Sequence, residues 1–259
     1  MAEPNDWKKA RNGLVAVLRM RTDPVGVKLL KASEMAELSD VKVLRTTAVC
    51  QMIAMSRYGK EGGIVAASVG GVKCLWATAC LGMTRSPERL VRGDLNRAFV
   101  RDEMAGKALQ DMIFAIGDGS RPYGGILTAP LDLFPGEPDV VVMYLTPGQA
   151  LKVILALSYD RGEVTENPIT GQAAVCQSIA RAMISGKVAI EIPCVGDRMY
   201  GLVQDDELVV VVPASRTRQI LDGMKGTDAF APYPFTPFLW WPALFPPEFE
   251  PTRSELDLD

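Results

Sequence analysis

Two nearly identical heptapeptides place a cysteine at the same position. "AVCQMIA" covers residues 48–54 and "AVCQSIA" covers residues 174–180, and the two differ only at their fifth letter. Each segment is predicted to form a helix with its cysteine in or just after the first turn. Unpaired amides and the positive end of the helix dipole favour a thiolate there, at Cys50 and at Cys176. If the two segments pack about a pseudo-twofold axis, both sulfurs face one cleft. In the other interpretation each cysteine is a small apolar residue on a helix face, as most buried free cysteines are.

The other three cysteines are Cys74, Cys80 and Cys194. No two cysteines have the spacing of a zinc ribbon or of a ferredoxin, so a metal ion or an iron–sulfur cluster would need ligands from distant segments. A site held by three or four of the five thiols is one hypothesis. Ordinary packing with one or two incidental thiols is the alternative.

The chain contains no histidine. Its absence excludes Ser-His-Asp and Cys-His nucleophile pairs, His-ligated zinc, facial-triad iron and His-ligated haem. Any general acid or base must be Asp, Glu, Lys, Tyr or Cys, and a tightly held transition metal must depend on cysteine.

Asp197 and Arg198 directly follow "CVG" at 194–196. The guanidinium of Arg198 offers a fork of donors that matches a carboxylate or a phosphate, so the two residues are candidates for binding a cofactor or an anionic substrate group. An internal ion pair at a strand end is the alternative. The acidic run "QDDE" at 204–207 is expected to be a solvated hairpin turn.

Composition bounds the class of protein. With 259 residues, 48% of them hydrophobic and 23% charged, the chain can bury a substantial core. A net charge of -3 gives no electrostatic footprint for nucleic acid or for an anionic membrane, so neither is expected as a partner. The N-terminal residues do not have the pattern of an export signal, and no stretch of the sequence is long and apolar enough to span a membrane. The odd number of cysteines does not suggest a set of disulfides. We therefore expect a cytoplasmic protein with reduced thiols.

These candidate residues must be positioned by alternating strands and helices. The first part predicts a helix over 4–20, a strand at 23–30, the first cysteine helix capped by Thr46 or Thr47, and a strand within 62–71. The segment 94–116 is expected to be one long helix or a broken pair.

The same order of elements returns from residue 138. A strand over 138–145 precedes a helix capped by Thr146, and the second cysteine helix, which ends at Gly186, precedes a strand at 187–193. Two further strands joined by a turn are expected over 197–213, followed by a helix capped by Ser215. The sequence therefore predicts an α/β or α+β fold with a mixed sheet, as one body over 1–225 with duplicated halves at about 20–93 and 138–213.

The C-terminal segment 226–259 differs in composition from the body. It is rich in proline, which disfavours helix and central strand, and in aromatic residues, which need cover. We expect an extended arm laid across the body or across a second subunit, which makes a homo-oligomer the predicted assembly.

Several segments resemble a known family. "DPVGVKL", "CQMIAMSRYGK", parts of "CLWATACLGM", "PDVVVMYLTPGQALKVILALSYDRG", "AAVCQSIARAM" and "GDRMYGLVQDDELVVVVP" together are similar to the prokaryotic domain of unknown function 169, over about residues 20–225. The resemblance implies a bacterial or archaeal protein and points to Cys50, Cys74 and Cys176 as the cysteines that fit the family pattern. Cys80 and Cys194 look like additions in this chain, and no activity is implied.

Two functional hypotheses follow. One is a redox or cofactor-binding protein, an enzyme or an electron carrier, with an iron–sulfur cluster or another thiolate-bound cofactor between the duplicated halves. The other is a regulatory or binding module, not an enzyme, that holds a small organic molecule or a tetrapyrrole in an apolar cleft, with structural cysteines. The two differ in whether ligand binding needs Cys50 and Cys176.

Overall fold

Local sequence signals account for many of the element boundaries. A computed structural model describes residues 6–116, 123–235, 251–252 and 254–256. The carboxylate of Asp6 accepts a hydrogen bond from the Lys9 amide (3.0 Å) and caps the first helix. Thr146 caps a long helix that has Pro147 at its first position and ends at Gly162, whose φ is 63°. The expected helices at 4–20 and after Thr146, and both cysteine helices, are confirmed.

The strands and helices alternate along the chain. The strands are β1 (Val25–Leu30), β2 (Lys42–Leu44), β3 (Val65–Ser68), β4 (Gly125–Pro130), β5 (Val140–Leu145), β6 (Ala189–Glu191) and β7 (Leu208–Pro213). The α-helices are α1 (Trp7–Leu18), α2 (Ala32–Ala36), α3 (Val49–Tyr58), α4 (Leu75–Cys80), α5 (Glu88–Val91), α6 (Glu103–Met112), α7 (Pro147–Arg161), α8 (Ala174–Ser185), α9 (Val195–Tyr200) and α10 (Thr217–Gly226). The described residues also form five short 3-10 helices: η1 (Lys60–Gly63), η2 (Asp94–Ala98), η3 (Leu131–Leu133), η4 (Ala214–Arg216) and η7 (Ser254–Leu256).

Seven strands of the described chain form one mixed sheet in the order β2-β3-β4-β1-β5-β7-β6. The pairings are antiparallel except that of β2 with β3, which is parallel. At the centre β1 pairs with β5, with Gly26 opposite Val141. The predicted class, α/β or α+β with a mixed sheet, is confirmed.

A similar pairing pattern occurs on either side of the sheet centre. β1 pairs with β4 and β4 with β3, and β5 pairs with β7 and β7 with β6, although β4 lies outside the predicted first half at about 20–93. The cysteine helices α3 and α8 contribute to one and the same core. A duplication would produce this arrangement, but the duplication itself stays a prediction.

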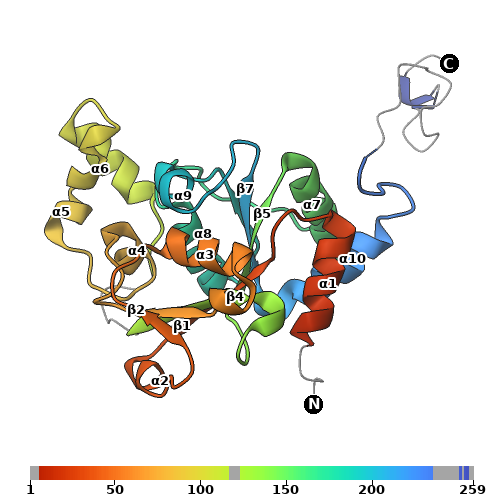
Figure 1. Ribbon diagram of the computed structural model, residues 1–259. Coiled ribbons are helices and arrows are strands. Elements are labelled where there is room, and N and C mark those ends of the chain that lie inside the picture. Colours follow the sequence, from red (N-terminus) through yellow and green to blue (C-terminus); the bar gives the residue numbers. More distant parts are fainter. Residues whose placement is uncertain (1–5, 117–122, 236–250, 253, 257–259) are drawn as a thin grey trace.

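Helices cover both faces of the sheet. Alternate residues of β5 point to opposite sides, as the period of a strand requires: Val140 and Val142 lie in a core with α3, α4 and α8, whereas Val141 and Met143 lie in a core with α1, α7 and α10. Figure 1 shows α1, α7 and α10 together on one side of the molecule, away from α3, α4, α8 and α9. The α3 and α8 side carries the candidate site.

Two expected boundaries are wrong. The segment 197–213 does not begin with a strand: α9 forms there because the Asp197 carboxylate accepts a hydrogen bond from the Cys194 amide (3.1 Å) and so caps a helical turn. The segment 94–116, by contrast, was expected as one long helix or a broken pair, and the second alternative is confirmed: η2 is followed by α6, which Asp102 caps. Neither Thr46 nor Thr47 caps α3; the Gln51 side chain accepts a hydrogen bond from the Ala48 amide instead (2.8 Å).

The last helix also begins later than predicted. Ser215 lies within η4, and α10 begins at Thr217. The strand β4 was not predicted, and the loop before it includes residues outside the described chain.

Most of the predicted C-terminal arm, namely residues 236–250, 253 and 257–259, lies outside the described part of the chain. Its described start is fixed to α7: the fully buried Lys152 ammonium donates hydrogen bonds to Asp228 (2.7 Å) and to the carbonyl of Ala231 (2.8 Å). The role of the arm in a homo-oligomer stays a prediction. Within the described residues, every helix is too short or too polar to cross a bilayer.

Candidate functional site

Four of the five cysteines line one cavity of about 520 Å³. They are Cys50, Cys74, Cys176 and Cys194, two from each predicted half. Cys176 is buried and the other three are half-buried. Cys80 is buried in the adjoining core and does not line the cavity.

All four cavity thiols lie at the start of a helix. Cys50 and Cys176 are the second residue of α3 and the third of α8, and Cys74 and Cys194 are the N-caps of α4 and α9. Amides in a first helical turn have no partner within the helix, and the N-terminal end carries partial positive charge. Four such ends therefore meet at the wall of one cavity.

Burial outweighs the helix ends in setting the charge of these thiols. Burial raises the pKa of Cys50 and Cys176 well above the usual range and that of Cys194 to about 12. Burial also raises the pKa of Cys74, although the backbone amides of Ala77 and Trp76 oppose it. The expected thiolates are thus neutral thiols in the protein alone, because the cavity is apolar. A coordinating metal displaces such protons.

Asp197 lies beside these thiols, whereas Arg198 points elsewhere. The Asp197 carboxylate lines the cavity, caps α9 and accepts a hydrogen bond from the Tyr144 hydroxyl (3.5 Å); burial raises its pKa. Arg198 donates to the carbonyl of Gln204 and to Asp205, each at 3.0 Å. The structure therefore does not bring Asp197 and Arg198 together as an anion site.

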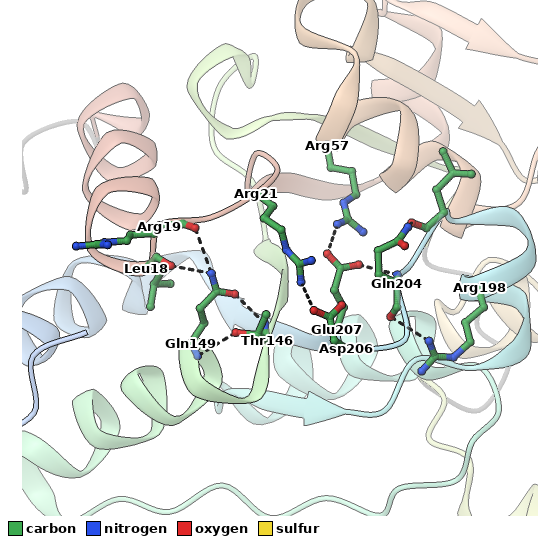
Figure 2. Close-up of polar contacts among 11 residues, drawn as sticks. Leu18, Arg19, Arg21, Arg57, Thr146, Gln149, Arg198, Gln204, Asp206 and Glu207 are labelled. Atoms are coloured by element: carbon green, nitrogen blue, oxygen red, sulfur yellow. Dashed lines mark hydrogen bonds and ion pairs between the residues drawn. The ribbon is translucent and has the colours of Figure 1, made fainter. Parts of the chain in front are cut away.

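A buried ion pair next to Tyr144 was not predicted. Arg57 of α3 donates a hydrogen bond to Glu207 at 2.6 Å, and both side chains are almost completely buried (Figure 2). The guanidinium also stacks on the ring of Tyr144, 4.4 Å from its centroid. The expectation of a solvated turn at 204–207 is wrong for Glu207, because its partner is 150 residues away in the sequence.

A third buried carboxylate supports the cavity wall. Glu191 of β6 accepts hydrogen bonds from the Thr170 amide (3.1 Å) and from the side-chain amide of Gln177 (2.9 Å). Gln177 also donates to the carbonyl of Gln172, a cavity residue (3.0 Å). Burial raises the pKa of Glu191 to about 7. The network fixes the segment that leads into α8 and Cys176.

The raised pKa of Glu191 predicts that the free energy of unfolding depends on pH. Between about pH 4.5 and 7 the unfolded chain has lost this proton while the folded chain keeps it, so the free energy of unfolding falls as pH rises through that window. The variant Glu191→Gln is expected to lack this term, which is on the order of 2 kcal/mol.

Urea unfolding of both proteins at pH 5 and pH 8 measures the term. The wild type should lose more stability than Glu191→Gln over this change of pH, and the comparison cancels the other titrating groups. Equal losses in the two proteins would contradict a raised pKa at Glu191.

The thiol side chains that line the cavity are donors of the type that binds sulfur-preferring metals and clusters. Soft thiolates bind zinc, copper(I) and iron–sulfur clusters. In the described part of the chain, however, no three Cys, Asp or Glu side chains are gathered tightly enough to hold a single metal ion. The four thiols are instead distributed around the cavity wall.

Comparison with known proteins places the chain in a family. The family model DUF169, described as "Uncharacterised ArCR", matches residues 13–223. A relative, "Uncharacterized protein MJ0308" of Methanocaldococcus jannaschii, is 25% identical over 225 residues, which are 85% of this chain and 94% of the relative. No solved structure matches the chain significantly. The expected resemblance is confirmed: the chain belongs to the family of domain of unknown function 169.

Proposed function

We propose that this protein binds an iron–sulfur cluster, or another thiolate-bound cofactor, in the cavity lined by Cys50, Cys74, Cys176 and Cys194. One observation carries the proposal: four thiols, each from the start of a different helix, line the same cavity. Cysteines that only pack in the core would not be expected to occupy the first turn or the N-cap of four different helices around one cavity.

The distribution of the thiols supports a group of several atoms. Single ions need ligands within a little over 2 Å of one point, which the described side chains do not provide. A cluster with several irons accepts one thiolate at each of its corners, so its ligands stand further apart.

The surrounding backbone supports a negatively charged group. A cluster bound by thiolates carries net negative charge, and amides at helix starts stabilise negative charge. Backbone amides of Ala77 and Trp76 favour the charged form of Cys74, and those of Asp197 and Ala174 favour that of Cys194. Hydrogen bonds to sulfur of this kind also set the reduction potential of a cluster.

The other residues of the cavity supply an apolar surrounding. Trp76, Ala77 and Val175 line it and limit the access of water, which further tunes a bound group. A cluster supplies one-electron transfer when it is bound. The chain itself supplies the thiolate ligands, the backbone amides that hydrogen-bond to them and the apolar lining of the cavity.

Anaerobic reconstitution of the full chain with ferric iron, sulfide and a thiol reductant tests the proposal. We expect a brown protein with broad visible absorption and with iron and sulfide in equal amounts. A protein that stays colourless and retains no iron after desalting would contradict it.

A further inference from the structure

We propose that the protein has a second binding site, a groove beside the thiol cavity, that takes a neutral organic molecule with aromatic or other apolar rings. The groove has a volume of about 590 Å³ and lies between α3 and the segment that follows α9. This inference goes beyond the proposed cofactor and does not depend on it.

One wall of the groove is a single face of α3. Gln51, Ala54, Met55 and Tyr58 all line it, and their spacing places them on one stripe of the helix. Tyr58 is 49% exposed, whereas Ala54 is buried and Met55 packs partly against the core. The stripe therefore presents mainly the exposed side chains of Gln51 and Tyr58 to the groove.

The opposite wall carries two exposed apolar residues. Tyr200 and Leu202 line the groove and are 52% and 57% exposed. Leu202 has a left-handed backbone with φ 55°, a conformation that costs a leucine on the order of 1 kcal/mol. Because Leu202 is exposed, burial of its side chain within the fold does not offset the cost of this backbone conformation. We attribute its position to contact with a ligand.

The charge of the lining defines the class of ligand. No lining residue in the described part of the chain is charged; besides those named, the lining consists of leucine, threonine and glycine. A charged ligand would lose its hydration there without a counter-charge. Tyrosine rings and aliphatic side chains instead favour a neutral, flat molecule.

The groove is continuous with the thiol cavity. Thr46, Thr47, Gln51 and Tyr200 line both hollows. A ring molecule in the groove therefore reaches the edge of the cavity in which we place the cofactor. This juxtaposition suits an organic substrate that meets a cofactor at one end.

Fluorescence titration with the neutral probe N-phenyl-1-naphthylamine tests the groove in the full chain. Leu202→Asn is the test variant, because Asn has nearly the same size and accepts a left-handed backbone, so folding is not impaired. Val164→Asn is the matched control, since Val164 is also an exposed branched residue outside helices and strands (62% exposed) and lines neither hollow.

We expect the probe to bind saturably. Leu202→Asn should weaken its affinity about fivefold to tenfold, because part of the apolar contact made by the leucine side chain is lost, and Val164→Asn should leave the affinity unchanged. The anionic probe 8-anilinonaphthalene-1-sulfonate should bind more weakly than the neutral one. Equal affinities in the two variants, no binding, or tighter binding of the anionic probe would overturn the proposal.

The variant Cys50→Ala separates this site from the cofactor. Cys50 does not line the groove, so this variant should keep its affinity for the probe even where it no longer retains iron. Loss of probe binding in Cys50→Ala but not in Leu202→Asn would place the probe in the thiol cavity and overturn the groove.

Discussion

Replacement of Arg57 by methionine is expected to lower the free energy of unfolding by about 3–5 kcal/mol, because it leaves the Glu207 carboxylate buried without its partner. The exposed fractions of the two side chains are 1% and 3%, so water cannot take the place of the guanidinium. The variant also removes the cation that stacks on Tyr144. Urea unfolding at pH 7, followed by circular dichroism, measures the change.

The chain offers a matched control for this substitution. Arg21 and Asp206 form an ion pair of similar length, 2.7 Å, but their side chains are 50% and 58% exposed (Figure 2). Arg21→Met should therefore cost less than about 1 kcal/mol. The double variant Arg57→Met, Glu207→Leu should recover part of the stability, because no buried charge is left. Equal losses in Arg57→Met and Arg21→Met would contradict a buried pair.

Replacement of Cys176 by alanine is expected to reduce iron binding by about tenfold or more in the reconstituted protein, because one of four thiolate ligands is removed. Cys50→Ala should have a similar effect, since the two residues take corresponding places on α3 and α8. Iron analysis after desalting, with the visible spectrum of the same sample, measures the loss.

Cys80→Ala is the matched control for the cavity cysteines. Cys80 is as buried as Cys176 but does not line the cavity, so the variant should retain its iron and lose only about 1 kcal/mol of packing. If Cys80→Ala lost as much iron as Cys176→Ala, the loss would reflect general destabilisation, and the four-thiol site would be wrong.

Much of the fold could be predicted because its signals are local. Asp6, Thr146, Pro147 and Gly162 mark helix ends through contacts within a few residues. The error at α9 has the same origin: the cap that Asp197 provides across three residues favours a helix over the strand that the apolar pattern suggested. The strand β4 was missed because its apolar residues follow a glycine-rich loop that gives no clear period.

The candidate site could be predicted in part. The repeated heptapeptide placed Cys50 and Cys176 at the starts of two helices, and both line the cavity. Cys194 was only an additional candidate, because its place at the cavity depends on the packing of α9 against α3. The pairing of Arg57 with Glu207, and the network around Glu191, could not be predicted, since their partners meet only through the sheet.

Whether the cavity thiols hold one cofactor together can be seen in an anaerobic crystal structure of the iron-loaded full chain, through anomalous scattering at the iron edge. We expect an anomalous peak inside the cavity, bonded to the sulfurs of at least three of Cys50, Cys74, Cys176 and Cys194. A cavity without a peak, or iron bound elsewhere on the chain, would contradict it.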